Sequence, residues 1–353
     1  MSDNETVTHH RVCHLCEAMC GLVIQTEGAK VVDIRGDRAD PLSRGHICPK
    51  AVALQDIHED PDRLRKPLKR VRSAPGVYHH EAIEWGEAFD LAADALASTI
   101  RDHGVDAVGA YFGNPAVHNY GMLTHQRNLF RHIRTRNRFS ATSVDQLPHH
   151  LVSLWCFGHM LLQPIPDVDR THYFLMLGAN PLASNGSLWT VPDVRRRLKD
   201  LQARGGKLVV IDPRRTETAE MASEHHFIKP GTDATFLLAM IHVLFRDGLV
   251  DPGAMKSYTD GVDEVGAAVT ELTPQWAEER TGIAAADIER IAHEMAAAEA
   301  ETVAVEAARE AAAAAAALAT VDATDEIALT MAKTRAARTA KAAEVAAMEA
   351  RVS

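Results

Sequence analysis

The segment CHLCEAMCGLVIQTEGAKVVDIRGDRADPLSRGHICPK, residues 13–50, contains four of the five cysteines in the chain. Their spacing is C-x2-C-x3-C-x27-C, formed by Cys13, Cys16, Cys20 and Cys48. Lys50 follows two residues after the last of them. Three thiols close together in the chain and a fourth that returns after a loop can converge on one point. The segment therefore predicts a metal centre held by four thiolates.

Two kinds of metal centre take four thiolates. A structural zinc ion is usually held by two C-x2-4-C pairs far apart in the chain, whereas here only Cys48 is distant. A cubane 4Fe-4S cluster spreads its cysteines over its corners, which suits three clustered ligands and a remote one. The spacing favours the cluster and leaves zinc as the alternative. Disulfides fit less well, because residues 1–8 are polar and acidic and lack the apolar segment of a secretory signal.

Bulk composition narrows the class of protein. The chain has 353 residues, 46% of them hydrophobic, which is enough for two domains with ordinary cores. Its net charge of -10 argues against general nucleic-acid binding, for which a basic excess is typical. No apolar run reaches the roughly 18 residues needed to span a bilayer, and no twin-arginine leader precedes the cysteines. We therefore expect a cytoplasmic protein without a membrane span.

Residues 11–62 predict short strands and turns around the cysteine loops. Apolar residues at 22–24 and 30–34 predict a β-hairpin that turns at Glu27-Gly28. Residues 60–80 carry three prolines and many basic side chains, which predicts an extended connection between two domains.

From Glu84 onward, helical and strand-like patterns alternate. The predicted helices cover residues 85–102, 119–132, 191–204 and 235–245, and the predicted apolar strands cover residues 107–112, 173–178 and 207–212. Short strands separated by such helices predict an α/β fold with a doubly wound, mostly parallel sheet and helices on both faces. Ligands of these sheets bind beyond the carboxyl ends of the strands.

Three loops at or near such strand ends are suited to phosphate groups. The first, GANPLASNG at residues 178–186, offers backbone amides and small polar side chains. The second, DPRRTET at residues 212–218, carries guanidinium and hydroxyl groups that suit phosphate oxygens. The third, KPGTDA at residues 229–234, turns into a helix. Each loop alone is also typical of a turn or a helix cap.

Together, these motifs resemble those of the molybdenum or tungsten bis-pterin guanine dinucleotide oxidoreductases. This superfamily includes formate dehydrogenases, nitrate reductases and dimethyl sulfoxide reductase. The resemblance covers residues 10–295 and lies in VCHLC with Cys20-Gly21, in Gly36-Asp37, in PLSRGHICPK, and in the loops G-A-N-P, D-P-R-x-T and P-G-T-D. It implies a 4Fe-4S cluster on the four cysteines, with Lys50 between the cluster and the pterin, where electrons pass.

The resemblance also implies a molybdopterin guanine dinucleotide, with molybdenum or tungsten, bound at the three loops. Asparagine and serine of the first loop would approach its phosphate or ribose, and aspartate and arginine of the second would contact the nucleotide. The aspartate of the third would accept hydrogen bonds from guanine, whose edge presents two adjacent donors. The matching positions are Asn180, Ser184, Asp212, Arg214, Thr216, Gly231 and Asp233.

By the same resemblance, the protein ligand of the metal stands eight positions after the asparagine that opens a loop. Asp145 stands eight positions after Asn137. Formate dehydrogenases have selenocysteine or cysteine at this position, whereas other branches have serine or aspartate. A hard carboxylate suits a high-valent oxo-metal, so Asp145 favours oxygen-atom transfer of the nitrate reductase kind. The alternative is that Asp145 is the N-cap of the apolar helix that follows.

Three nearby side chains are further candidates. His149 and His150 could donate to a bound oxyanion or could be polar surface at the start of a helix. Cys156 lies in an apolar run at residues 154–157, which predicts a buried and inert thiol, and it is the second choice for a metal ligand.

After residue 295 the composition changes. Residues 296–353 contain no glycine, proline or aromatic residue, and seven alanines follow one another from Ala311 to Ala317. This composition predicts one or two long helices with little core. The predicted organisation is therefore a small 4Fe-4S domain at residues 1–65, an α/β pterin-dinucleotide domain at 66–295 and an alanine-rich helical tail at 296–353.

Full-length members of the superfamily continue with a second dinucleotide-binding domain and a barrel that closes over the pterins, and we expect both to be missing here. Two functions follow. The first is a molybdopterin-dependent oxidoreductase that performs two-electron redox or oxygen-atom transfer on a small-molecule substrate. It would pass electrons through its cluster to a redox partner protein or subunit. The alternative is a non-catalytic or split-subunit electron-transfer module.

Overall fold

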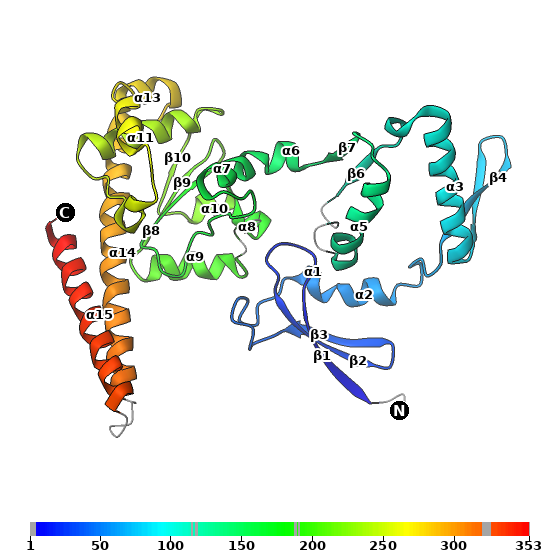
Figure 1. Cartoon of the computed structure of the whole chain (residues 1–353), viewed down its shortest axis with the longest axis horizontal. Coiled ribbons are helices and arrows are strands. Elements are labelled where there is room, and N and C mark those ends of the chain that lie inside the picture. The colour runs from blue at the N-terminus through cyan, green and yellow to red at the C-terminus, as the bar shows by residue number, and fades with distance from the viewer. Residues whose placement is uncertain are drawn as a thin grey trace. The chain divides into compact units, whose positions relative to one another are not determined.

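The computed structural model describes residues 5–113, 116, 119–186, 189, 191–319 and 326–352. The chain divides into two compact units (Figure 1). The first runs to Ile165 and also includes the short segment that ends at Asp193. The second comprises Pro166–Gly186 and the chain from Val194 onward. Both units mix helices and strands, which confirms the predicted α/β class.

The first unit begins with a small antiparallel sheet of order β1-β2-β3. Its strands are β1 (Thr6–Val12), β2 (Gly21–Glu27) and β3 (Lys30–Gly36), followed by the short helices α1 (Pro49–Val52) and α2 (Leu54–Glu59). The hairpin of β2 and β3 was predicted, and Gly28 turns it with φ 58°. A glycine accepts this left-handed conformation without steric cost. Strand β1 was not predicted at this position, since its side chains are almost all exposed.

Residues 68–82 form a hairpin, so the prediction of an extended connection at residues 60–80 was wrong. Strand β4 (Leu68–Ala74) pairs antiparallel with β5 (Val77–Ala82). The Pro75-Gly76 pair makes the turn, with φ 78° at Gly76. Pro67 and Pro75 stand just outside the strands, where the missing N–H of proline removes no hydrogen bond from the ladder. The prolines therefore bound these strands and do not exclude them.

The rest of the first unit is helical with one small parallel sheet. Its helices are α3 (Trp85–His103), α5 (Tyr120–His132), α6 (Thr142–Asp145) and α7 (Leu147–Phe157), with a 3-10 turn η1 (Val105–Ala107). Strand β6 (Ala110–Phe112) pairs parallel with β7 (Arg138–Ser140). The carboxamide of Asn119 caps α5 by accepting from the N–H of Met122 at 2.9 Å. The helices predicted at residues 85–102 and 119–132 are confirmed to within one residue at each end. Strand β6 is shorter than predicted, because η1 ends at Ala107, where the strand was expected to start.

The second unit contains a parallel sheet of order β10-β9-β8. Its strands are β8 (Tyr173–Leu177), β9 (Lys207–Ile211) and β10 (Glu224–His226), connected through α8 (Pro181–Ser184), α9 (Val194–Ala203) and α10 (Glu217–Met221). Leu208, Val209, Val210 and Ile211 are all 0% exposed. Because successive side chains of a strand point to opposite faces, both faces of β9 are covered, as the sequence predicted.

A helical layer covers the face of β9 that carries Val209 and Ile211. It is built from α11 (Asp233–Arg246), α13 (Pro274–Thr281) and the first part of α14 (Ala285–Ala319), with η3 (Gly253–Ser257) and α12 (Val262–Ala268) between them. The buried residues of α11 follow the spacing of one helix face: Phe236, Ala239, Met240 and Val243. Ile288 and Ile291 of α14 complete this core.

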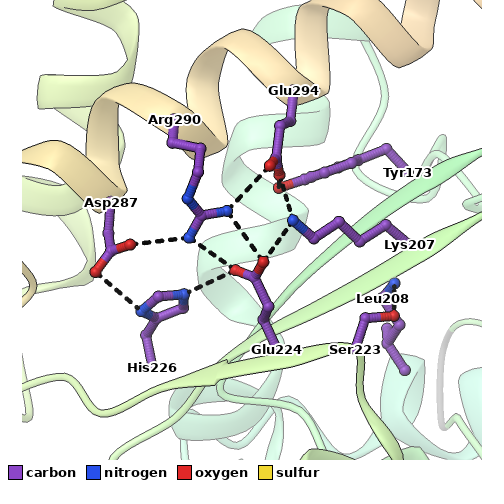
Figure 2. A network of polar contacts seen from close by, with 9 residues as sticks. All are labelled: Tyr173, Lys207, Leu208, Ser223, Glu224, His226, Asp287, Arg290 and Glu294. Atoms are coloured by element: carbon purple, nitrogen blue, oxygen red, sulfur yellow. Dashed lines mark hydrogen bonds and ion pairs between the residues drawn. The ribbon is translucent and has the colours of Figure 1, made fainter.

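A network of charged side chains ties α14 to the sheet (Figure 2). Glu224 of β10 accepts from Lys207 of β9 at 2.5 Å and from Arg290 of α14 at 2.9 Å. Lys207 also reaches Glu294 at 2.6 Å, and Tyr173 of β8 donates to the same carboxylate at 3.2 Å. The network therefore joins all three strands to one helix at a half-buried edge.

The chain ends in two long helices. Helix α14 and α15 (Glu326–Val352) pack against each other and lie side by side, orange and red in Figure 1. This confirms the prediction of long helices in the alanine-rich region. The domain boundary predicted after residue 295 falls within α14, because that helix continues without a break from the core into the alanine-rich segment. Within the described residues, no helix has the length and apolar character needed to cross a membrane.

Candidate functional site

The four clustered cysteines lie around a small core of the first unit. Cys13 and Cys20 are buried, and Cys16 and Cys48 are half-buried. Cys13 and Cys20 belong to an apolar cluster that also contains Leu22, Ile34 and Ala51. The backbone N–H of Cys13 donates to the carbonyl of Cys20 at 2.8 Å, which closes the C-x2-C-x3-C loop onto itself.

The thiols act on one another electrostatically. Burial raises the pKa of Cys20, and the neighbouring thiols Cys13, Cys16 and Cys48 add to this effect because a thiolate beside other thiolates is unfavourable; together they bring the pKa to about 11. Burial also raises the pKa of Cys13, and Cys16 and Cys48 add to this effect. Their electrostatic coupling places the four thiols in one region of the first unit, and their role as metal ligands stays a prediction. The site can hold its thiolates only when positive charge compensates them, so metal binding would release protons.

The backbone around the thiols turns tightly and then enters a helix. Met19, between the second and third cysteines, has φ 47°, and its N–H donates to the carbonyl of Cys16 at 3.3 Å. Cys48 is the N-cap residue of α1, and Pro49 opens that helix. Proline suits this first helical position, since its fixed φ matches the helix and its missing N–H would have no partner there. The fourth cysteine thus stands at a defined helix start.

Four thiolates without further ligands fit an iron-sulfur cluster. Within the residues that the structure describes, no three histidine, cysteine, aspartate or glutamate side chains stand close enough to hold a single metal ion. The donor set itself, four cysteine thiols, is the one that a cubane cluster spreads over its separate corners. Lys50 is exposed on α1 and lies close enough to Cys13 to oppose the rise of its pKa. A positive charge thus stands beside the thiols.

The three predicted phosphate-type loops meet at one edge of the parallel sheet. They follow the carboxyl ends of β8, β9 and β10, which are neighbours in the sheet. Hydrogen bonds join the second loop to β10, since the N–H of Asp212 donates to the carbonyl of His226 at 3.1 Å. The carboxyl edge of such a sheet is where nucleotides bind in doubly wound folds.

Two stretches of the chain match models of known protein families. Residues 6–59 match the molybdopterin oxidoreductase Fe4S4 domain, and residues 63–343 match molybdopterin oxidoreductase. The chain belongs to the molybdopterin oxidoreductase family. Membership implies a 4Fe-4S cluster and a molybdopterin cofactor, which agrees with the four convergent thiols and with the expectation from the sequence motifs.

Individual members of the molybdopterin oxidoreductase family are similar over most of this chain. "Probable oxidoreductase YoaE" of Bacillus subtilis is 30% identical over 80% of this chain and 40% of its own length. The thiosulfate reductase molybdopterin-containing subunit PhsA of Salmonella typhimurium is 28% identical over 84% of this chain and 37% of its own. Among solved structures, acetylene hydratase from Pelobacter acetylenicus is 28% identical with a TM-score of 0.65, over 80% of this chain and 38% of that one. The chain thus spans about two fifths of the length of these relatives.

In this molybdopterin oxidoreductase chain, three of the predicted nucleotide-binding side chains shape the loops. Asn180 accepts a hydrogen bond from the hydroxyl of Thr218 at 2.7 Å and donates to Glu217 at 2.8 Å, which joins the first loop to the second. Asp212 accepts from the N–H of Arg214 at 2.7 Å. Thr216 caps α10 by accepting from the N–H of Ala219 at 3.1 Å. The cap and turn alternatives for these residues therefore describe what their side chains do, and their roles toward a nucleotide stay predictions.

The remaining predicted positions line the same edge. Arg214 and Ser184 are exposed, and the hydroxyl of Ser184 accepts from the N–H of Gly186 at 3.3 Å. Gly231 has φ 81° in the turn before α11, and Asp233 is the half-buried first residue of that helix. An arginine and the amino end of a helix both suit an anion. A carboxylate at the third loop suits the donors of a guanine edge.

Asp145 is the exposed last residue of α6. The N-cap position of α7 belongs to Gln146, so the alternative of Asp145 as the cap of that helix was wrong. The reason is that α6 and α7 adjoin, with only Gln146 between them. His149 and His150 lie in the first turn of α7, the former exposed and the latter half-buried. The assignment of Asp145 as a metal ligand stays a prediction.

The prediction that Cys156 is buried was wrong. The thiol is exposed on α7, where Trp155 is 75% exposed and Phe157 is 48% exposed. Ser153 is the one buried residue of that helix. An apolar run predicts burial only when a neighbouring element covers it, and within its own unit α7 has most of its surface uncovered.

Two polar side chains of the site escaped the sequence reasoning. Thr218 and Ser43 are buried, and each bonds to a loop that is distant in the chain. Both lie inside the predicted motifs DPRRTET and PLSRGHICPK, and this position was the signal that the sequence offered. Their burial is visible only in the structure.

Proposed function

We propose that Cys13, Cys16, Cys20 and Cys48 bind the 4Fe-4S cluster of this protein. The observation that carries the proposal is that Cys13, Cys16 and Cys20 lie in or against one apolar cluster of the first unit. Cys48 begins α1, whose Ala51 belongs to the same cluster. Their burial beside an apolar cluster supports it further, since a low local dielectric and few waters help to retain a cluster.

We propose that the three sheet-edge loops bind the guanine dinucleotide part of the molybdopterin. Arg214 would pair with phosphate oxygens, and Asp233 would accept from guanine. Thr216 and Gly231 would shape the backbone of their loops, because the Thr216 hydroxyl caps α10 and Gly231 turns the chain into α11. Asn180 would hold the first loop against the second while Ser184 faces the ligand.

The chemistry proposed for the complete protein is two-electron redox or oxygen-atom transfer on a small-molecule substrate. The bound molybdenum or tungsten supplies the two-electron change and the oxygen-transfer chemistry. Asp145 would offer it a hard carboxylate oxygen as the protein ligand. Lys50 would place positive charge between the pterin and the cluster, where electrons pass toward a redox partner protein or subunit. Relatives named as subunits support the expectation of a partner.

The domain boundaries at residues 1–65, 66–295 and 296–353 belong to the same proposal. The cluster domain would occupy the first range and the dinucleotide loops the second. The relatives differ in their names, from thiosulfate reductase to acetylene hydratase, and one fold can host many reactions. Naming a substrate therefore requires activity measurements.

Metal and nucleotide analysis of the purified protein tests these proposals. We expect four irons, one molybdenum or tungsten, and guanine nucleotide on acid release.

Cys48→Ser should lose iron, and the exposed Cys156 gives the matched control, since Cys156→Ser should keep it. Asp145→Asn should keep iron but lose molybdenum or tungsten, with Asp90→Asn on α3 as its control. Zinc in place of iron, or full iron in Cys48→Ser, would reject the cluster proposal.

The second candidate is a split-subunit or non-catalytic electron-transfer module. Iron without molybdenum, tungsten or guanine nucleotide would support this candidate and reject the first. Iron together with the complete pterin cofactor would reject it.

A further inference from the structure

Ser43 lies where the two cysteine-bearing loops cross. Its side chain is buried, with 1% exposure, inside an otherwise polar loop. The backbone N–H of Gly21, the residue after Cys20, donates to the hydroxyl oxygen of Ser43 at 3.1 Å. The hydroxyl of Ser43 donates in turn to a carboxylate oxygen of Asp40, and its backbone N–H reaches the same oxygen at 2.7 Å.

Gly21 is held from a second side by the same loop. Its carbonyl accepts from the N–H of Asp37 at 2.9 Å. A Cβ on Gly21 would stand 2.6 Å from the Cβ of Asp40, so the two backbones approach as closely as glycine allows. Both backbone polar groups of the residue after the third cysteine are therefore satisfied by the segment that leads to Cys48.

The carboxylate of Asp40 remains charged in this arrangement. Its pKa is lowered by the hydrogen bond from the Ser43 hydroxyl and then by backbone N–H groups, because each donor favours the ionised form. The backbone carbonyl of Asp40 also accepts from Arg44 at 2.9 Å, which tightens the turn before Cys48. Asp40 thus organises the loop that bears the fourth cysteine.

We propose that Asp40 and Ser43 are positioning residues of the cluster site, which fix the loop of Cys48 to the backbone that follows Cys20. Neither residue is one of the four proposed thiol ligands. Their contacts, called the clamp below, keep the Cys48 thiolate beside those of Cys13, Cys16 and Cys20. These three thiolates stand close together in the chain and need no such link. Loss of the clamp should release the fourth corner first, so that a cubane cluster gives up one iron before it gives up all four. The inference rests on the proposed assignment of the four cysteines as ligands.

The test compares Ser43→Ala with Ser98→Ala, because Ser98 is a half-buried residue of α3 whose hydroxyl donates to a carbonyl of its own helix at 3.1 Å. For the anaerobically purified full chain, we expect four irons in the unmodified protein and in Ser98→Ala. Ser43→Ala should approach three irons and release iron to a chelator at least tenfold faster. After one-electron oxidation with ferricyanide, it should show the electron paramagnetic resonance signal of an oxidised three-iron cluster. Asp40→Asn, which keeps the shape of the side chain, should change in the same direction by a smaller factor.

Each outcome decides the inference. Circular dichroism checks that the variants are folded, and Asp40→Asn serves if Ser43→Ala does not fold. Four irons and unchanged release rates in both variants would overturn the clamp alone. Equal loss of all four irons from a folded variant would also overturn it, because the fourth corner would then not be special. An unmodified protein without iron would instead overturn the cluster assignment, and the clamp with it.

Discussion

The hydroxyl of Thr218 donates a hydrogen bond of 2.7 Å to the carboxamide oxygen of Asn180, although 38 residues separate them in the chain. The backbone N–H of Thr218 reaches the same oxygen at 3.3 Å. The hydroxyl also accepts from the N–H of Leu182 at 3.3 Å. One buried side chain therefore holds two loops of the sheet edge in register. The Asn180 carboxamide is an internal brace between the first and second loops.

Thr218→Val should weaken both the fold and the nucleotide site. Valine has almost the same shape but leaves the N–H of Leu182 without its partner, and a buried unsatisfied group costs about 1–3 kcal/mol. The free energy of unfolding in urea should fall by that amount, and the guanine nucleotide content should fall with it.

Thr270→Val is the matched control for this prediction. Thr270 is exposed, and its hydroxyl bonds to carbonyls one helical turn earlier in its own segment. Its unfolding free energy and nucleotide content should stay unchanged. Equal nucleotide content in Thr218→Val and the parent protein would show that the brace is not needed for binding.

Gly36→Ala should disrupt the cysteine site. A Cβ at this position would lie 2.0 Å from the backbone oxygen of Gly45, three residues before Cys48. Because a backbone oxygen cannot move away as a flexible side chain can, the loop of Cys48 must shift. We expect most of the iron to be lost, measured as iron per folded protein.

Gly86→Ala provides the control for the glycine test. Gly86 lies in α3 with no atom near the position of a Cβ, and alanine is about 1 kcal/mol more favourable than glycine within a helix. This variant should keep its iron, and its free energy of unfolding should stay the same or rise. Normal iron in Gly36→Ala would mean that the loop yields more easily than its backbone contact suggests.

The elements that the sequence predicted well are those whose local pattern agrees with their burial. Strand β9 is an uninterrupted apolar run because both of its faces are covered, and Asn119 signals the start of α5 by a local cap. The four cysteines stand out in the sequence because ligand chemistry constrains residue type and spacing more strongly than a fold does.

The features that were missed depend on partners distant in the chain. Strand β1 has little apolar character, and its pairing with β2 makes it a strand. The burial of Cys156 was mispredicted because an apolar run carries no information about what covers it. The brace of Asn180 and Thr218 joins residues in different motifs, so neither motif alone reveals it.

Glu224 should make the stability of the protein depend on acid pH. Burial alone would raise its pKa, but hydrogen bonds from Lys207, Arg290 and His226 outweigh burial and lower the pKa to about 2. A carboxylate with a depressed folded-state pKa stabilises the fold above its unfolded pKa of about 4.3. That contribution is lost as pH falls from there toward 2. Glu224→Gln should therefore show a shallower loss of unfolding free energy across this window.

The control for the acid prediction is Glu279→Gln, because Glu279 is an exposed carboxylate whose side chain is 81% accessible. Exposed ion pairs contribute little, so its pH profile should match that of the parent protein. The measurement is urea unfolding at several pH values from 6 down to the lowest at which the protein stays folded. Parallel profiles for all three proteins would mean that the network of Figure 2 does not stabilise the fold through Glu224.

Cys156 should be the one thiol that reacts quickly in the cluster-loaded protein. It is exposed on α7, whereas the other four cysteines are buried or half-buried and would be bound to iron. A disulfide reagent such as dithionitrobenzoate should titrate about one thiol per chain in the native state, and none in Cys156→Ser. After unfolding with an iron chelator, five thiols should react in the parent protein, in agreement with its five cysteines.

Because ligation by iron and not burial alone must protect Cys16 and Cys48, removal of iron from the folded protein should raise the number of reactive thiols above one. A count that stays at one after iron removal would show that the fold shields these thiols without a cluster.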